Sequence, residues 1–175
     1  MKQVGSPQKQ SDNEDLREDH YRSMVREFGG RYKKFDWPSV EVLLNLVHVY
    51  DVIWVHFAKL MAASGLSPAV FNVLMILSRG TGKKLKQRDI SKLLLSSRAN
   101  VTGLVNSLVR KGLAKRAMDK NDRRAWLVEI SSKGKALLEN YLPFHYAEVY
   151  RILTSFSGSE KKMFSRLLCK VKSEI

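Results

Sequence analysis

The sequence predicts a mainly α-helical protein of the α+β class, in which a short β-hairpin lies between long helices. Apolar residues recur every three or four positions over most of residues 39–175, as they do on the buried face of a helix. Two short segments, 113–118 and 125–130, flank a polar turn at 119–124 and have the pattern of two hairpin strands. The chain has 175 residues, which suits one domain, or one domain with an additional terminal arm.

The N-terminal residues 1–38 are predicted to form an extension of the main domain. Residues 1–12 are polar, lack apolar periodicity and are expected to be disordered. Residues 13–28 contain enough apolar side chains for a short helix, which the following pair of glycines would end. The main domain is therefore expected to span residues 39–175.

A long helix is predicted at residues 39–64, with Ser39 as its N-cap and Gly65 just past its end. It carries two adjacent apolar rows at helical spacing, which are Val40, Leu43, Val47, Tyr50, Trp54, Phe57 and Met61, and Leu46, Val49, Ile53 and Leu60. One row is enough to pack a helix on a core, so two rows need cover over a wider arc. A partner subunit is a natural source of that cover in a small protein.

Three shorter helices and an edge strand are predicted next, at 68–79, 87–94 and 97–111 for the helices and at 85–86 for the strand. Ser67 and Pro68 have the types preferred at the start of a helix, and Gly112 suits the end of one. The resulting order of helix, turn, helix, strand, turn, strand over residues 68–131 is that of a winged helix-turn-helix, a DNA-binding lobe.

The C-terminal part is predicted to be helical. One helix spans about 132–155, and Pro143 is expected to kink it. A last helix begins at a capping box formed by Ser157 and Glu160.

The charge of the chain favours a polyanionic partner. The net charge is +14 and the sequence pI is about 10.0. Residues 83–124 hold thirteen Lys and Arg against three Asp, so most of the excess positive charge lies in that segment. Charge that is concentrated on one lobe indicates a binding surface for double-stranded DNA, whereas charge that serves solubility is spread out.

The helix at 97–111 is predicted to enter the major groove, because its outer face carries small and polar residues, namely Ser97, Arg98, Ala99, Asn100, Thr102 and Gly103. Arg98 is suited to a bidentate pair with guanine and Asn100 to one with adenine. Ser97 and Thr102 have the size for phosphate contacts. Gly103 lowers helix propensity by about 1 kcal/mol relative to Ala, which a close approach to DNA would explain. An ordinary solvated helix face is the alternative.

The turn of the hairpin is predicted to be the DNA-binding wing, with Lys120, Asp122, Arg123 and Arg124 as its site residues. Asp122 is placed to hold the Arg124 guanidinium by a charge-assisted pair, and Lys120 and Arg123 would lie near phosphates. The alternative is a polar hairpin with one local ion pair.

Four further cations precede or begin the helix at 87–94, namely Lys83, Lys84, Lys86 and Arg88. They either contact the DNA backbone, which adds affinity without specificity, or are simply solvated.

From about Ser39 to Ile175 the chain resembles the MarR family of winged-helix transcriptional regulators. The resemblance rests on five motifs in order, at 89–94 (DISKLL), 96–105 (SSRANVTGLV), 111–113 (KGL), 122–125 (DRRA) and 131–134 (SSKG). It implies a sequence-specific regulator, usually a repressor, that binds a pseudo-palindromic site as a homodimer. The dimer would be held by the helices at 39–64 and 132–175, and Arg124 would enter the minor groove.

The resemblance further implies that a small molecule or oxidation releases the protein from DNA. Members of the family have effector pockets between the dimer helices and the DNA-binding lobe, for which the candidates here are Trp54, His56, Phe57, Phe71 and His145. Core or dimer packing is the alternative role for these side chains. The chain departs from the family in its longer extension, residues 1–38, and in lacking the reactive Cys that peroxide-sensing members carry in the first long helix.

The sequence argues against several other classes of protein. It has no catalytic constellation and no phosphate-binding loop, so we expect neither an enzyme nor a cofactor. Its single Cys169 excludes an intramolecular disulfide, is consistent with a cytoplasmic location, and is expected to be a buried thiol. No metal-ligand cluster is visible. The N-terminus lacks the apolar segment of a signal peptide. The sequence has no run of about 18 apolar residues, so we expect no membrane-spanning segment and no membrane partner.

A different function within the DNA-binding class stays open, that of a basic architectural protein that coats DNA with little base preference. An RNA-binding or membrane-surface role fits less well. The basic segment has no aromatic residue for base stacking before Trp126, and its cations are scattered over several elements.

Overall fold

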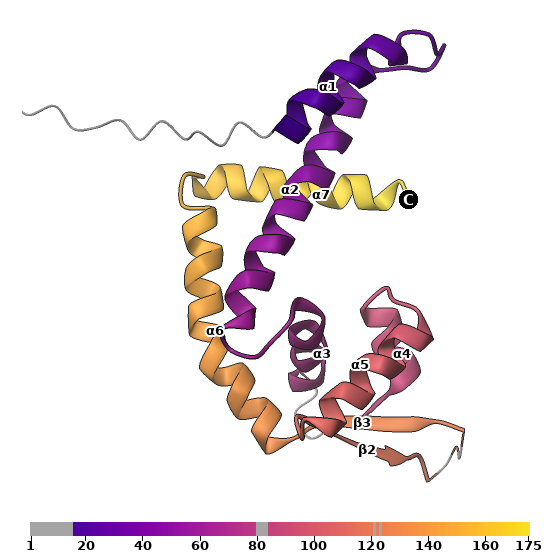
Figure 1. Cartoon of the computed structure of the whole chain (residues 1–175), viewed down its shortest axis with the longest axis vertical. Coiled ribbons are helices and arrows are strands. Elements are labelled where there is room, and N and C mark those ends of the chain that lie inside the picture. Colours follow the sequence, from indigo (N-terminus) through magenta and orange to yellow (C-terminus); the bar gives the residue numbers. More distant parts are fainter. Residues whose placement is uncertain (1–15, 80–83, 121, 123) are drawn as a thin grey trace, which may run out of the picture. The chain divides into compact units, whose positions relative to one another are not determined.

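A computed structural model describes residues 16–79, 84–120, 122 and 124–175. The chain is mostly helical with one small sheet (Figure 1), and its elements are α1 Leu16–Gly29, α2 Trp37–Ala62, α3 Pro68–Ser78, β1 Leu85–Lys86, α4 Gln87–Leu93, α5 Arg98–Arg110, β2 Ala114–Met118, β3 Trp126–Ile130, α6 Ser132–Ile152 and α7 Gly158–Ser173. The predicted fold class is confirmed, and each predicted element is present within a few residues of its expected bounds.

The chain divides into two units, Met1–Lys59 and Leu60–Ile175. The first contains α1 and most of α2, and two arginines of α1 contact α2. Arg22 donates a hydrogen bond to Asn45 Oδ1 at 3.1 Å and lies 4.0 Å from a Glu41 carboxylate oxygen. The Arg26 guanidinium lies over the Trp37 ring, 4.5 Å from its centre. The helix predicted at 13–28 is therefore confirmed from Leu16 onward and is fixed to α2 by directional contacts.

The start of α2 differs from the predicted one. Ser39 is not the N-cap, because the helix begins at Trp37 and Ser39 lies in its first turn. Asp36 takes the capping role, since its carboxylate accepts hydrogen bonds from the Ser39 hydroxyl and from the Ser39 backbone N–H, the latter at 3.0 Å. These two bonds, the hydroxyl first, lower the pKa of Asp36.

The exposed apolar surface of α2 is the main feature of the first unit. Its large apolar side chains are exposed in the single chain, and they are Val42, Leu43, Val47, Val49, Tyr50, Val52, Ile53, Trp54 and Val55. Within the described part of the chain, α2 is the one helix long and apolar enough to cross a membrane, although the expectation from the sequence was that no such helix exists. Polar residues interrupt the apolar rows of α2, so it contains no continuous run of about 18 apolar residues. A helix that is covered by protein in an assembly has the same length and composition, so this finding alone does not place α2 in a membrane.

The core of the second unit is built around α3, whose Val73, Leu74 and Leu77 are almost fully buried. Side chains from four other elements complete it, and they are Ile90 of α4, Val101, Val105 and Leu108 of α5, Val128 of β3, and Leu138 of α6. Ser67 caps α3 by accepting a hydrogen bond from the Val70 backbone N–H, with Pro68 as the first helical residue. The predicted helix start is thus confirmed.

The sheet has the strand order β1-β3-β2, and both pairs are antiparallel. Leu85 of β1 pairs with Val128, which places the predicted edge strand beside β3. Ala114 pairs with Ile130 and Met118 with Trp126, so the hairpin closes through the turn predicted as the wing.

A compact junction joins α5 and the β2–β3 hairpin to α6. Gly112 ends α5 with a φ of +70°, a left-handed conformation that glycine adopts without strain. The Ser131 hydroxyl donates to the Gly112 carbonyl at 2.6 Å and accepts from the Gly134 backbone N–H at 3.0 Å. The Ser131 N–H donates to the Leu113 carbonyl at 3.1 Å. The same few residues therefore end α5, begin β2, end β3 and cap α6.

The C-terminal helices follow the predicted order. α6 continues through Pro143 and bends along its length in Figure 1. The predicted capping box of α7 is confirmed, because the Ser157 N–H donates to Glu160 Oε2 at 2.7 Å and the Glu160 N–H donates to Ser157 Oγ at 3.3 Å. Cys169 is exposed, contrary to the expected buried thiol, because no residue of α7 is buried in the single chain.

The Gly134 position leads to a stability prediction. A Cβ at Gly134 would overlap the Leu113 carbonyl oxygen and press on Ile130, and backbone cannot move aside as a flexible side chain can. We expect Gly134→Ala to lower the free energy of unfolding by about 2–3 kcal/mol, measured by urea denaturation. Gly158→Ala is the matched control, because nothing lies within 4 Å of a Cβ there. Equal stability of the two variants would contradict the proposed close contact.

Candidate nucleic-acid interface

α5 carries the predicted recognition face. Ser97 caps the helix by accepting a hydrogen bond from the Asn100 N–H at 3.2 Å. Val101, Val105 and Leu108 turn into the core. The opposite side of the helix is exposed, and its predicted site residues Arg98, Ala99, Asn100 and Gly103 all lie there. The structure therefore presents most of the predicted face to solvent, as major-groove entry requires.

Two of the predicted side chains already have partners within the protein. The Asn100 amide nitrogen donates to Ser96 Oγ at 2.7 Å, which orients the amide on the exposed face. Thr102 is only partly exposed, and its hydroxyl donates to the Arg98 carbonyl at 2.8 Å and accepts from Gln87 Nε2 at 2.6 Å. The hydroxyl proton of Thr102 thus forms a hydrogen bond within α5, whereas the sequence suggested a contact of this hydroxyl with a phosphate.

The turn before α5 adopts a strained backbone conformation. Leu95 has a φ of +49° and is almost completely exposed. Its N–H donates to the Lys92 carbonyl and the Ser96 N–H donates to the Ser91 carbonyl, the pattern of a helix end that normally has glycine at this position. The hydrogen bonds of the turn therefore hold Leu95 in a left-handed backbone conformation that is unfavourable for leucine.

The wing differs from its predicted internal pairing. Asp122 Oδ1 accepts a hydrogen bond from the backbone N–H of Arg124 at 3.1 Å, and no ion pair joins these two described side chains. The carboxylate thus stabilises the turn and leaves the Arg124 guanidinium available to other partners. Lys120 is exposed in the same turn, whereas Arg123 and Lys83 lie outside the described residues.

Some of the predicted basic contacts are used within the lobe. Lys86 Nζ lies 3.1 Å from Asp119 Oδ2, and Asp119 is buried, so this pair fixes β1 to the base of the wing. Lys84 lies 3.9 Å from Glu129 Oε1. Arg88 lies 3.8 Å from its neighbour Asp89 and stays largely exposed. The positive charge of this segment is therefore divided between holding the lobe together and facing outward.

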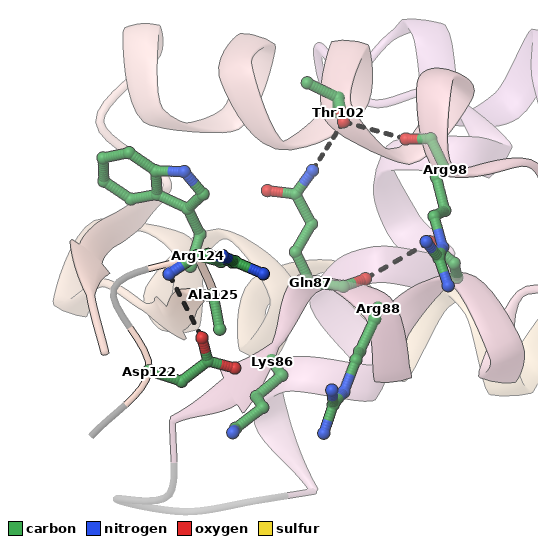
Figure 2. A pocket seen from close by; sticks show the side chains of 10 residues that line it. Lys86, Gln87, Arg88, Arg98, Thr102, Asp122, Arg124 and Ala125 are labelled. Atoms are coloured by element: carbon green, nitrogen blue, oxygen red, sulfur yellow. Dashed lines mark hydrogen bonds between the residues drawn. The ribbon is translucent and has the colours of Figure 1, made fainter. Parts of the chain in front are cut away.

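A cavity of about 520 Å³ lies between α4, α5 and the wing (Figure 2), and its lining residues are Lys86, Gln87, Arg88, Ser91, Arg98, Thr102, Asp122, Arg124, Ala125 and Trp126. It contains four cationic side chains and one carboxylate. Arg98 from the recognition helix and Arg124 from the wing, predicted as parts of two separate sites, line the same cavity. A concave surface of this charge suits a strand of nucleic acid.

Sequence reasoning missed a contact that braces the wing. Arg116 of β2 donates to Asn106 Oδ1 of α5 at 2.7 Å, and its guanidinium lies 4.4 Å from the centre of the Trp126 ring. The strand register would have indicated this contact, because Trp126 pairs with Met118, which makes Arg116 its diagonal neighbour. One side chain thus connects α5, β2 and β3.

The predicted effector-pocket residues belong to both units. In the second unit, the rings of Phe71 and His145 lie 4.7 Å apart, and the buried Tyr141 packs edge-on to Phe71 at 5.6 Å. Burial lowers the pKa of His145. Burial, with a smaller contribution from the Glu148 charge, raises the pKa of Tyr141.

In the first unit, Trp54 stacks on Tyr50 with ring centres 5.9 Å apart, and His56 lies edge-on to Phe57 at 5.7 Å. These residues therefore form two aromatic pairs in the first unit and one cluster in the second. A separate cavity of about 350 Å³ in the second unit is lined by Phe71, Asn72, Met75, Ile76, Arg79, Leu93 and Leu94. No cluster of three or more potential metal ligands occurs among the described residues.

Comparisons with known proteins agree with this geometry. Residues 64–125 match the sequence model of the MarR family. The chain is 32% identical over 133 residues to the HTH-type transcriptional regulator MhqR of Bacillus subtilis, which covers 76% of this chain and 90% of that protein. It is 29% identical over 144 residues to the HTH-type transcriptional repressor YetL of the same organism, covering 82% of this chain and 86% of YetL.

Among solved structures, the chain is similar to BpsR of Bordetella bronchiseptica, whose DNA binding is regulated by 6-hydroxynicotinic acid. The TM-score is 0.68 and the identity 26%, and the match covers 75% of this chain and 98% of BpsR. A match over three quarters of the chain is longer than the predicted lobe at 68–131, so the similarity is not limited to that lobe.

Gly103 gives a prediction that separates stability from binding. A Cβ at Gly103 would meet nothing within 4 Å, so the fold does not require glycine there. Gly103→Ala should raise the free energy of unfolding by about 1 kcal/mol. It should also weaken binding to duplex DNA about tenfold, if one close contact worth about 1.4 kcal/mol is lost. Thermal melting and fluorescence anisotropy measure the two effects. Gly158→Ala is the control, because it lies far from α5 in sequence and should leave the DNA affinity unchanged. If Gly103→Ala also left the DNA affinity unchanged, the close approach of α5 to DNA would be contradicted.

His145 gives a prediction for pH. Its pKa is lower in the folded protein than in the unfolded chain, so the unfolded chain binds the proton more readily. The stability is therefore complete above the unfolded pKa of about 6.5 and falls as the pH decreases below it. Thermal melting of the wild type should shift downward between pH 7.5 and 5.5 by more than that of His145→Gln. His20→Gln, on the exposed α1, should behave as the wild type. Parallel curves for His145→Gln and wild type would refute this assignment.

Proposed function

The chain belongs to the MarR family of winged-helix regulators, and on that premise we propose that it is a sequence-specific transcriptional repressor that binds double-stranded DNA as a homodimer. The observation that carries the proposal is the shared basic cavity of Arg98 on α5 and Arg124 on the wing. Because these side chains come from the two elements that read DNA in winged-helix proteins, one protomer can engage a major groove and the adjacent minor groove together.

The residues divide into two roles. Arg98 and Asn100 carry groups that hydrogen-bond to base edges, so they supply base preference. Ser97 has the size for a phosphate contact, and Ala99 and Gly103 allow α5 to approach closely. Lys120, Arg123 and Arg124 supply attraction to the backbone and minor groove. Thr102 and Asp122 act from within, by holding α5 and the wing in shape.

The apolar surfaces of the long helices support the proposed dimer. Besides α2, the helices α6 and α7 expose large apolar side chains in the single chain, and they are Phe144, Tyr146, Val149, Tyr150, Met163, Phe164, Leu167, Leu168 and Val171. Exposed apolar area on this scale is typical of a surface that another protein covers. A second copy of the chain would then place two recognition helices about 34–36 Å apart, one turn of DNA.

A small-molecule effector is the second part of the proposal. The Phe71, Tyr141 and His145 cluster provides aromatic surface and buried polar atoms of the kind that line ligand sites. BpsR, a structural relative, is regulated by 6-hydroxynicotinic acid. We propose that the effector of this chain binds next to that cluster. The proposed function involves no catalytic step, and the protein would act in the cytoplasm, where the bacterial relatives meet DNA.

Selection of binding sites from a random duplex pool by the purified protein tests the function. At about 150 mM salt, we expect an inverted repeat with half-site centres about 10 bp apart. Recovery of DNA without any motif, with an affinity that collapses as salt rises, would instead indicate a non-specific architectural protein.

Two substitutions test the division of roles on the selected site. Arg98→Ala should relax base preference at one position of each half-site by about 1–3 kcal/mol. Arg124→Ala should weaken binding to all sequences and reduce the salt dependence. Lys135→Ala, which removes one charge from the exposed face of α6, is the control and should do neither. Equal effects of both arginine variants on random DNA would contradict the assignment.

A further inference from the structure

Gln87 lies where α4, α5 and the wing meet. It is the first residue of α4 and directly follows β1, whose Lys86 pairs with Leu127 of β3. Its backbone position is thereby fixed to the sheet that carries the wing. Figure 2 shows its side chain extending from α4 toward α5 along the wall of the basic cavity.

A chain of two hydrogen bonds runs from Gln87 into the recognition helix. The amide nitrogen donates to Thr102 Oγ1 at 2.6 Å, and the same oxygen donates its proton to the Arg98 carbonyl at 2.8 Å. Thr102 is one turn beyond Arg98 in α5, so the bond reaches the turn that carries Arg98 and Asn100. Ile90 of α4 and Val101 and Val105 of α5 are fully buried in the apolar core of the second unit.

Apolar packing alone does not fix the rotation of a helix closely, because it has no preferred direction. A hydrogen bond depends on distance and angle, so it fixes the rotation of a helix more closely. A small rotation or axial shift of α5 would displace Arg98 and Asn100 from the base edges, and bidentate pairs tolerate little displacement. The Gln87–Thr102 bond is thus placed where directional control matters for reading bases.

The other end of the Gln87 amide is unusual. Its carbonyl oxygen is buried and has no hydrogen-bond partner among the described residues. In Figure 2 this oxygen points away from Thr102, toward the side of the cavity where Arg124 lies. A buried acceptor without a partner destabilises a fold, so glutamine is a poor choice here if stability alone is considered.

We propose that Gln87 is a positioning residue for DNA recognition, which sets the rotation and axial position of α5 through Thr102 and thereby determines base specificity. The proposal rests on the proposed function. It assigns a specificity role to a residue that acts through another side chain, Thr102. It also explains why an amide with one unpaired end occupies this site.

The test uses Gln87→Met, which keeps the length of the side chain and the net charge but removes both polar ends. Affinity is measured for the selected operator and for a scrambled duplex of equal length, together with the melting temperature. We expect the ratio of the two affinities to fall about tenfold, with the scrambled-duplex affinity unchanged within a factor of about two because no charge is lost. The melting temperature should stay the same or rise, because the unpaired carbonyl is removed.

Two further variants sharpen the test. Thr102→Val should lower the same ratio, and the Gln87→Met/Thr102→Val double variant should be no worse than the more affected single variant, because both act through one hydrogen bond. Ser78→Ala is the matched control. It removes a side-chain hydrogen bond within α3, to the Met75 carbonyl, that does not connect α4 with α5, and it should leave the ratio unchanged.

Amide hydrogen exchange of the free protein gives a readout that needs no operator. Gln87→Met should speed exchange in the first turns of α5, and Ser78→Ala should not. A preserved affinity ratio, additive single effects, or unchanged exchange in α5 each overturn the inference. If the wild type selects no operator, the proposed function fails, and the exchange experiment still decides whether Gln87 positions α5.

Discussion

The arrangement of the second unit depends on the junction where Ser131 contacts Gly112 and Gly134. Its three hydrogen bonds connect the end of the recognition helix, both strands of the hairpin and the first turn of α6. Gly134 allows the α6 backbone to come within reach of the Leu113 carbonyl, which no larger residue permits. In the proposed dimer, the direction of α6 would therefore determine where the recognition helix and the wing point. A change in the angle of α6 would move both DNA-contacting elements together, as one body.

The basic residues of the lobe have two different uses, and charge counts alone do not distinguish them. Lys86 is paired with the buried Asp119, and Arg116 is held between Asn106 and Trp126. Arg98 and Arg124 have no ion pair among the described residues and line the open cavity. Because only cations that meet phosphates release counterions on binding, the salt dependence of DNA affinity should be smaller than the thirteen Lys and Arg of residues 83–124 suggest.

Periodicity and end signals predicted most of the fold, because helices and hairpins are encoded by neighbouring residues. Ser67, Ser157 and Gly112 act at helix ends as their types indicate. Ser39 misled the prediction because Asp36, three residues earlier, is an equally good acceptor and lies nearer the true start of α2. The candidate site was predicted as two separate groups, and their common cavity depends on strand register and helix packing. The Gln87–Thr102 contact depends on how α4 packs on α5, and the Arg116–Trp126 contact depends on the exact register of β2 and β3, so helix periodicity and end signals predicted neither.

The stacking of Arg116 on Trp126 has a practical consequence for spectroscopy. Of the three tryptophans in the chain, Trp126 is the one in the second unit, since Trp37 and Trp54 belong to α2. Its indole is partly exposed at the wall of the basic cavity and lies against a cation. Indole emission responds to nearby charge and to water, so with Trp37 and Trp54 replaced by phenylalanine the tryptophan fluorescence, excited where the tyrosines do not absorb, would arise from the base of the wing alone. The protein thus contains its own optical reporter at the surface where nucleic acid is proposed to bind.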